Sequence, residues 1–345
     1  MPEVSVLIAA YNAASTLPQC LDSLSRQTLA AIEVICVDDC STDNTLDILR
    51  HQAAADSRFV VLQTPENSGQ AVARNLALQH ATAPFVCMVD ADDWLSPSAL
   101  EDALAVFRTF PTTDCVAFRL IRVDEAGKNE DEQSLPLPLA KGAAMTGREA
   151  FEACMDGWHL HGLYVTRTTL HRQYPFDTTT RLYSDDNTSR IHYLHSREVR
   201  SCNGIYYYRQ HPTSMTTGFN LRRFDFMEAN LSLLFALNKE GIRGEVLRRF
   251  EGGRWQTFIT CYRLYLSHRH EIGESDTEAL RQRFATILHT FRPSRLALRY
   301  RWKPGYWLLF NTTLFDWQQR CYQSLWQDGV KAWFGKRDSL TRVPY

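Results

Sequence analysis

The sequence lacks a long uninterrupted apolar segment, which excludes the simplest kind of membrane protein. Its 345 residues contain no stretch of about 18 uncharged apolar residues, the length that a membrane-spanning helix requires. The N-terminus, Met1-Pro2-Glu3-Val4, has no basic segment and leads directly into an apolar run. We therefore expect neither a signal peptide nor a spanning helix, and we expect a cytoplasmic protein.

Glycine-rich phosphate loops are also missing. There is no Gly-x-x-x-x-Gly-Lys-Ser/Thr loop, and the first apolar run ends in Ala9-Ala10-Tyr11-Asn12 rather than in a glycine-rich turn. These absences disfavour P-loop phosphotransferases and nicotinamide enzymes. None of the nine cysteines forms a Cys-x-x-Cys pair, and no His/Cys cluster has zinc-finger spacing. We therefore expect cysteines that act as small apolar residues in a reducing compartment.

The composition indicates a globular core and an uneven distribution of charge. Apolar residues make up 44% and charged residues 22%, and the net charge of −1 gives no general attraction to nucleic acid. Residues 291–345, however, hold ten Lys/Arg against three Asp/Glu, together with five of the eight tryptophans. This basic, aromatic segment predicts contact with an anionic and partly apolar partner.

Apolar runs and helical segments alternate through the first hundred residues. The runs cover 4–10, 33–37, 59–62 and 85–89, and a segment with helical periodicity separates each pair. This is the spacing of βαβ units, which form a parallel sheet with helices on both faces. Beyond residue 219 helical periodicity dominates. We predict a Rossmann-like, mostly parallel α/β domain over 1–218, divided into 1–95 and 96–218, and a helical region over 219–345.

Carboxylates gather where the fourth apolar run ends. Asp90, Asp92 and Asp93 follow it within four residues. An ionised group that leaves water requires a partner, and a divalent metal together with a diphosphate would supply one. A solvated acidic turn is the alternative. Tyr11-Asn12 and Asp38-Asp39 follow the first two runs, so the polar strand ends should meet at one edge of the sheet.

Four motifs, in order, resemble the inverting family 2 glycosyltransferases of the GT-A fold. They are residues 4–12, residues 37–43, Asn67-Ser68-Gly69 with Ala73-Arg74-Asn75, and Asp90-Ala91-Asp92-Asp93. The resemblance covers about residues 1–215. It implies a GT-A catalytic domain in which 1–95 is the nucleotide-binding half and 96–218 the acceptor half.

The resemblance also implies a donor and a metal. The donor is a UDP-sugar, and the metal is Mn²⁺ or Mg²⁺. Tyr11 and Asp39 would contact the uracil, Asp90 the ribose or diphosphate, and Asp92 the metal, with Asp90 as a further ligand. The other donor-site positions that it implies are Ala9, Asn67, Gly69, Ala91 and Asp93.

Two of the implied donor-site positions have alternatives. Arg74 follows the Gly69 turn, and we expect it to place a fixed cation near the phosphates, or else to form a surface salt bridge. Asp93 would orient the donor sugar or cap a helix near Ser96.

An inverting transfer also needs a base that takes the proton of the acceptor hydroxyl. Asp185-Asp186 match the family's acidic pair, with Asp186 as the base, and acidic stabilisation of a helix N-terminus is the alternative. Residues 208–214 resemble the segment that closes over the diphosphate. There Arg209 would offset charge, and His211 would contact the metal or a phosphate or be structural.

The basic, aromatic segment 291–345 suggests where the protein works. Trp, Lys and Arg favour the surface of an anionic membrane, which predicts peripheral attachment to the inner face of the cytoplasmic membrane. Packing on the catalytic domain or on a second copy, as in a homodimer, is the alternative. The predicted activity transfers a sugar to a saccharide or lipid-linked acceptor of bacterial lipopolysaccharide, O-antigen or capsule. The alternatives are a non-catalytic nucleotide-sugar-binding scaffold and a sugar nucleotidyltransferase.

Overall fold

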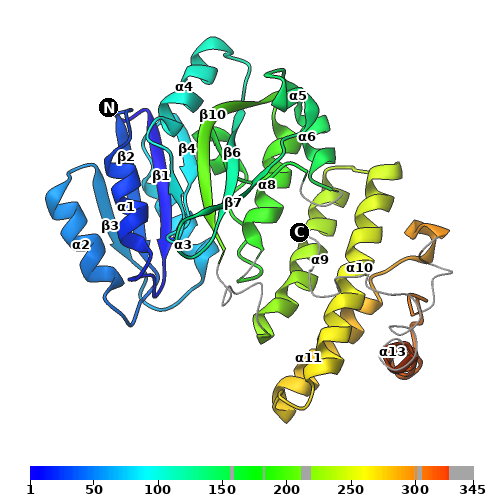
Figure 1. Cartoon of the computed structure of the whole chain (residues 1–345). Helices are drawn as coiled ribbons and strands as arrows, with labels where there is room; N and C mark the ends of the chain where they lie inside the picture. Colours follow the sequence, from blue (N-terminus) through cyan, green and yellow to red (C-terminus); the bar gives the residue numbers. More distant parts are fainter. Residues whose placement is uncertain (156–158, 182, 211–218, 299, 301–304, 326–345) are drawn as a thin grey trace. The chain divides into compact units, whose positions relative to one another are not determined.

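The computed structural model describes residues 1–155, 159–181, 183–210, 219–298, 300 and 305–325 (Figure 1). The chain divides into two compact units. The first unit comprises residues 1–154 and 158–214, and the second comprises 155–157 and 215–345.

One mixed sheet forms the centre of the first unit. Its strands are β1 (Val4–Ala10), β2 (Ile32–Asp38), β3 (Phe59–Gln63), β4 (Phe85–Met88), β5 (Trp94–Leu95), β6 (Cys115–Val123), β7 (Asn129–Gln133), β8 (Met145–Thr146), β9 (Tyr164–Arg167) and β10 (Glu198–Arg209). The main path runs β3-β2-β1-β4-β9-β6-β10-β5. Strands β1 to β4 pair in parallel, as do β6 and β10, whereas β9 lies antiparallel between β4 and β6. The predicted, mostly parallel α/β sheet is confirmed.

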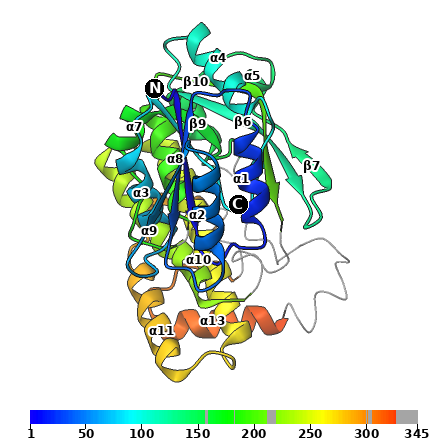
Figure 2. The ribbon, with the colours of Figure 1, turned by 90° about the vertical axis from the view of Figure 1, so that its left-hand side faces the viewer.

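Helices cover both faces of this sheet (Figure 2). They are α1 (Leu17–Ser25), α2 (Thr45–Ala55), α3 (Gln70–His80), α4 (Ala99–Thr109), α5 (Leu137–Ala140), α6 (Gly147–Ala153), α7 (Thr168–Gln173) and α8 (Ser184–His195). In β1, Val6 and Ile8 join a core with α1, α2 and α4, whereas Leu7 joins a separate core with α3. Because neighbouring side chains point to opposite covered faces, every residue of the strand except Ser5 is apolar.

The strand order reverses direction at β1. The chain passes from β1 to β2 and β3 on one side, and β4 then pairs with β1 on the other side. In open parallel sheets such a reversal places a crevice at the carboxyl ends of the strands. The residues after β1, β2 and β4 therefore emerge at one edge, which is where the sequence places its polar groups.

The second unit is helical. Its elements are η1 (Leu221–Phe224), α9 (Asp225–Lys239), α10 (Gly244–His268), α11 (Glu274–Leu288), η2 (Pro293–Arg295) and α13 (Thr312–Leu325). Trp255 of α10 is fully buried and packs against Phe258, Phe291 and Phe315, so an aromatic core joins the helices. Within the described ranges, no helix combines the length and the apolar character needed to cross a bilayer.

Candidate active site

Tight turns shape the loops that follow β1 and β2. The backbone N–H of Asp39 donates to the carbonyl of Ala10 at 2.8 Å, and the side-chain oxygen of Asn12 accepts from the Thr42 backbone at 2.8 Å. Tyr11 lies between these contacts and keeps 44% of its surface exposed. Its ring is therefore accessible at the edge where a nucleotide base is predicted to bind.

Left-handed backbone marks the same neighbourhood. Asn12, Cys40 and Tyr183 have φ of 49°, 60° and 66°, and among the residues described no other non-glycine residue has a positive φ. Each flanks a predicted site residue: Tyr11, Asp39 or the Asp185-Asp186 pair. Sparsely populated backbone conformations of this kind concentrate at functional sites.

The carboxylate of Asp39 organises the turn before α3. One oxygen accepts from the Ser68 backbone at 2.9 Å and from the Thr64 hydroxyl at 2.8 Å, and the other accepts from the Gly69 backbone at 2.7 Å. Gly69 has φ of 92°, a conformation that favours glycine. Asn67 adds a side-chain bond to the Asp39 carbonyl at 3.3 Å. These contacts make Asp39 the anchor of the turn, and its contact with uracil stays a prediction.

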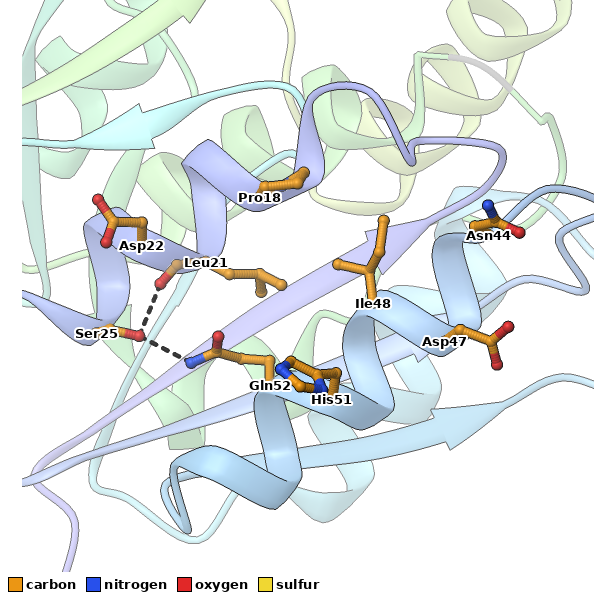
Figure 3. Close-up of a pocket in the computed structure, with 9 residues that line it drawn as sticks. All are labelled: Pro18, Leu21, Asp22, Ser25, Asn44, Asp47, Ile48, His51 and Gln52. Atoms are coloured by element: carbon orange, nitrogen blue, oxygen red, sulfur yellow. Dashed lines mark hydrogen bonds between the residues drawn. The ribbon is translucent and has the colours of Figure 1, made fainter.

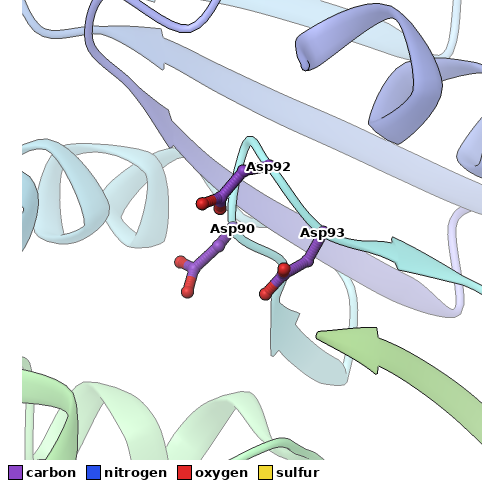
Figure 4. A group of neighbouring side chains, drawn as sticks. All are labelled: Asp90, Asp92 and Asp93. Atoms are coloured by element: carbon purple, nitrogen blue, oxygen red, sulfur yellow. The ribbon is translucent and has the colours of Figure 1, made fainter. Parts of the chain in front are cut away.

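The three carboxylates after β4 form one cluster (Figure 4). Oxygens of Asp90, Asp92 and Asp93 all lie within 4.8 Å of one another. Asp93 is 1% exposed, so the alternative of a solvated turn is wrong for this residue, whereas Asp90 and Asp92 are partly exposed. Burial, together with the charges of Asp92 and Asp90, holds the pKa of the Asp93 carboxyl well above its usual range. Because a divalent cation would offset this repulsion, the three residues fit an oxygen-ligated Mn²⁺ or Mg²⁺.

Strand β10 holds this cluster in place. The Tyr206 hydroxyl donates to one oxygen of Asp93 at 2.9 Å, and the Arg209 backbone donates to the other at 2.8 Å. The alternative in which Asp93 caps a helix near Ser96 is wrong, because α4 begins at Ala99 after Ser98. Nothing in the sequence pattern around Tyr206 indicated more than a strand, so its contact with Asp93 was missed.

Arg74 of α3 lies buried beside the cluster. Its Nη2 is 2.5 Å from the Asp90 carboxylate, and its Nη1 is 3.9 Å from Asp185. The side chain is 2% exposed, so the alternative of a surface salt bridge is wrong. Its guanidinium lies over the ring of Phe176, 5.4 Å from the centroid. Arg74 therefore links the carboxylates after β4 with the acidic pair of α8.

The Asp185-Asp186 pair stands in the first turn of α8. Burial, with a further contribution from the Asp185 charge, raises the pKa of Asp186 to about 8, and Arg190 opposes the shift. A helix N-terminus alone would lower the pKa of a carboxyl group, so the helix-cap alternative does not explain this environment. A carboxylate with a pKa near neutrality suits a general base.

Arg209 uses its guanidinium to hold protein groups. Nε donates to the Asp92 carbonyl at 3.0 Å, Nη1 donates to the Glu125 carbonyl at 2.8 Å, and Nη2 donates to Gln19. Any effect of Arg209 on a diphosphate would therefore pass through the loop that it supports. His211 lies outside the described residues.

Two further predicted donor-site positions are alanines, Ala9 and Ala91, which lie in the chain around the site. Ala9 of β1 stands opposite Val37 in the ladder with β2. Ala91 is buried in the carboxylate loop, where it joins the same core as α1 and α4.

A separate hollow of about 560 Å³ lies between α1 and α2 (Figure 3). It is lined by Pro18, Leu21, Asp22, Ser25, Asn44, Asp47, Ile48, His51 and Gln52. None of these is a predicted site residue. The candidate active site thus lies at the carboxyl edge of the sheet and not in this hollow.

Comparisons with known proteins agree with this geometry. Residues 5–174 match the family model described as Glycosyl transferase family 2. The chain is 28% identical over 246 residues to EpsH of Bacillus subtilis, a proposed glycosyltransferase, covering 69% of this chain and 71% of that protein. It is 43% identical over 103 residues to TuaG of Bacillus subtilis, a proposed glycosyltransferase of teichuronic acid biosynthesis, covering 30% of this chain and 41% of TuaG.

A solved structure resembles nearly the whole chain. The crystal structure of S. aureus TarS 1-349 in complex with UDP-GlcNAc aligns with a TM-score of 0.65 and 20% identity, covering 95% of this chain and 92% of that one. At this identity the likeness concerns the fold, and it confirms the GT-A architecture. Through residues 5–174 the chain belongs to glycosyl transferase family 2, and it is a glycosyltransferase.

Proposed function

We propose that this glycosyltransferase moves a sugar from a UDP-sugar to a saccharide acceptor, with inversion at C1 and with a divalent metal. The observation that carries the proposal is the juxtaposition of two carboxylate groups. Asp90 and Asp185 come from distant parts of the chain, and both lie beside the buried Arg74 guanidinium. A donor site and a base are the two parts that an inverting transfer requires.

The donor side of the proposal rests on the sheet edge. Tyr11 is exposed there, Asp39 lies next to it, and TarS was crystallised with UDP and with UDP-GlcNAc. Asp92 and Asp90 would hold Mn²⁺ or Mg²⁺, with Asp93 buried beside them and His211 as a further predicted ligand. Such an ion, when bound, neutralises negative charge on a leaving diphosphate.

The acceptor side rests on Asp186. Its carboxylate takes the proton of the acceptor hydroxyl while that oxygen forms the new bond to C1 of the sugar. The bond from C1 to the β-phosphate oxygen breaks, and UDP leaves with the electron pair. Because the attack comes from the face opposite the leaving group, the configuration at C1 inverts.

The relatives suggest a biological setting. EpsH and TuaG are proteins of Bacillus subtilis, and the name of TuaG refers to teichuronic acid. We place this chain in the synthesis of a bacterial surface polysaccharide. Lipopolysaccharide, O-antigen and capsule are the products we predict from sequence, and the TuaG relative adds teichuronic acid to that range. The family match argues against a scaffold or a nucleotidyltransferase.

An exposed aromatic face of the second unit supports peripheral attachment to an anionic membrane. Trp307, Phe310, Leu314 and Trp317 are 46%, 40%, 54% and 63% exposed. Leu314 and Trp317 are three residues apart on α13 and therefore share one face of the helix. The Gln318 side chain donates to the Trp307 carbonyl at 3.1 Å, which joins α13 to the chain at Trp307. Tryptophans on a segment rich in Lys and Arg match the surface of an anionic bilayer.

Vesicle flotation tests this attachment. We expect the protein to float with phosphatidylglycerol vesicles but not with phosphatidylcholine vesicles. The double variant Trp307→Ser/Trp317→Ser should lose this binding. Phe235→Ser is the matched control, because Phe235 is 64% exposed on α9 and lies outside this face. A double variant that still floats, or that instead changes from dimer to monomer in light scattering, would contradict the membrane assignment.

The function itself is tested with purified protein and a panel of UDP-sugars. We expect one donor to raise the melting temperature in the presence of Mn²⁺ or Mg²⁺ and to release UDP when a saccharide acceptor is added. EDTA should abolish the release. Stabilisation by a GDP-sugar alone would overturn the assignment of a UDP-sugar as donor. UDP release that EDTA does not affect would overturn the requirement for a metal.

A further inference from the structure

Asn75 joins α3 to residues 176–181, the segment that leads into α8. Its side-chain Nδ2 donates to the carbonyl of Phe176 at 2.9 Å, and the Phe176 backbone N–H donates to its Oδ1 at 2.9 Å. The two residues are 101 positions apart in the sequence. Because one planar amide binds both backbone groups, this contact fixes the orientation of the segment as well as its position.

The ring of Phe176 is seated between the same elements. It is 6% exposed and packs with Ala71 of α3 and Met88, the last residue of β4. The Arg74 guanidinium lies over it, and His171 meets it edge-on at 4.7 Å. The start of the segment is therefore fixed to the strand that carries the Asp90–Asp93 cluster and to the helix that carries Arg74.

We call the hydrogen bonds between Asn75 and Phe176 the first tie of this segment. A second tie, made by Arg181, holds its far end. The Arg181 guanidinium donates to the Asn67 side-chain oxygen at 3.0 Å and to its carbonyl at 3.3 Å. Asn67 is itself bonded to Asp39 in the turn before α3. Both ties run from the donor half of the unit to the segment 176–181, and α8 begins at Ser184 directly beyond it.

We propose that Asn75 is a positioning residue that sets where the Asp185-Asp186 pair stands relative to the donor carboxylates, with Arg181 as a second, weaker tie. The inference rests on the proposed role of Asp186 as the base. That base must reach an acceptor hydroxyl held at C1 of the donor, and a misplacement of about 1 Å costs roughly 10²-fold in rate. The predicted uracil and metal residues follow β1, β2 and β4, so Asn75 and Arg181 are not among them. Arg181 does contact Asn67, a predicted donor-site position, so Asn75→Ala is the cleaner test of positioning.

Three variants separate positioning from general stability. Asn75→Ala removes both bonds to Phe176, and Arg181→Ala removes the bonds to Asn67. Because Arg181 is exposed, we expect this second variant to fold normally. Gln27→Ala is the matched control. Gln27 is 6% exposed and also binds backbone at both ends of its amide, to Ser96 at 2.8 Å and Leu100 at 3.2 Å, but at the start of α4.

The expected result is a loss of turnover without a loss of donor affinity. For Asn75→Ala we expect kcat to fall on the order of 10- to 100-fold while the Kd for UDP stays within about twofold, and we expect a smaller fall for Arg181→Ala. Gln27→Ala should lower the melting temperature by a similar amount and leave kcat unchanged. An equal fall in kcat for Gln27→Ala and Asn75→Ala would overturn the proposal.

Hydrogen exchange gives a readout that does not depend on activity. Amides of residues 183–190 should exchange faster in Asn75→Ala and in Arg181→Ala than in the wild type, and should not change in Gln27→Ala. Unchanged exchange at α8 in both variants would show that the ties do not position the helix. If the wild-type protein transfers no sugar, the proposed function is refuted. If the two variants still exchange faster at residues 183–190 than that wild type, the structural role of Asn75 and Arg181 stands.

Discussion

The two carboxylate groups of the site are held by different kinds of contact. The Asp90–Asp93 cluster follows a central strand directly, and β10 binds it through the Tyr206 hydroxyl and the Arg209 backbone. The Asp185-Asp186 pair follows a segment tied to the rest of the unit by the side chains of Asn75 and Arg181. The cluster is therefore part of the sheet. The pair stands at the start of a helix that is placed by side-chain contacts, both of the segment before it and of the helix itself, such as Tyr193 with the His161 carbonyl at 2.6 Å.

This difference predicts that the two carboxylate groups control different steps, namely binding of donor and metal on one side and turnover on the other. A cluster fixed by the sheet offers a preformed site for charge, and it should determine donor and metal affinity. A base carried on a tied segment should determine turnover, because only its distance from the acceptor hydroxyl matters to the chemical step. Substitutions in the two groups should therefore separate binding from catalysis.

The largest effects are expected from removing one carboxylate of each group. Asp92→Ala and Asp186→Asn should each lower transfer by at least about 10³-fold. Asp92→Ala should also weaken UDP binding measured with Mn²⁺ by calorimetry, whereas Asp186→Asn should leave that binding nearly unchanged. Near-normal turnover of Asp186→Asn would show that another group is the base, and equal loss of UDP affinity in both variants would remove the division.

A smaller effect on the donor side is expected from Tyr206→Phe. The loss of this hydroxyl leaves a buried oxygen of Asp93 without its donor, which should cost about 1–3 kcal/mol in the free energy of unfolding. It should also weaken Mn²⁺ binding by roughly 10- to 100-fold, because Asp93 is no longer held beside Asp90 and Asp92. Thermal unfolding and metal titration measure the two quantities. Metal affinity equal to that of the wild type would contradict the role of β10.

A shift in pH dependence is expected on the base side. Because burial raises the pKa of Asp186 to about 8, the base is protonated below that pH, and kcat/KM for the donor should rise with pH and level off above about 8. Removing the neighbouring charge with Asp185→Asn should move this limb to lower pH. If the rise of kcat/KM with pH occurs at the same pH in Asp185→Asn as in the wild type, Asp185 does not influence the base.

The same raised pKa has a consequence for stability. A carboxyl group that favours its protonated form in the folded state makes a contribution to stability that is fully present below its unfolded pKa near 4 and is lost as pH rises towards 8. The melting temperature should therefore rise in Asp186→Asn relative to the wild type at pH 8 more than at pH 5. An equal change at both pH values would argue against the buried environment.

The smallest effect is expected at Cys40, on the donor side. Its φ of 60° disfavours a side chain with a Cβ, so Cys40→Gly relieves strain, while glycine also gives the unfolded chain more freedom. The two terms nearly cancel, and we expect a change below about 1 kcal/mol in the free energy of unfolding. UDP affinity should not change. A loss of UDP affinity would show that the Cys40 side chain itself contributes to the donor site.

Local sequence pattern predicted much of the sheet and part of the site. The run 85–89 is apolar because β4 is covered on both faces, and the structure places the strand at Phe85–Met88. Residues 159–164 read as strand-like in the sequence and predict a strand there, whereas β9 runs from Tyr164 to Arg167. Residues 159–163 are neither helix nor strand. His161 is nevertheless buried among them, and burial lowers the pKa of its imidazole to about 4.

The sequence by itself determined the parts of this protein that depend on residue type and short spacing. It contains the alternation of strands and helices, the carboxylates after β4, and the nine cysteines that are unpaired in the structure and mostly buried. The tertiary structure alone decided that Tyr206 holds Asp93, that Arg74 lies between Asp90 and Asp185, and that Asn75 binds Phe176. Each of these contacts joins segments at least 16 residues apart, and most join segments about a hundred apart. The topology of the backbone determines which distant residues meet in these contacts. Local periodicity carries no information about that topology.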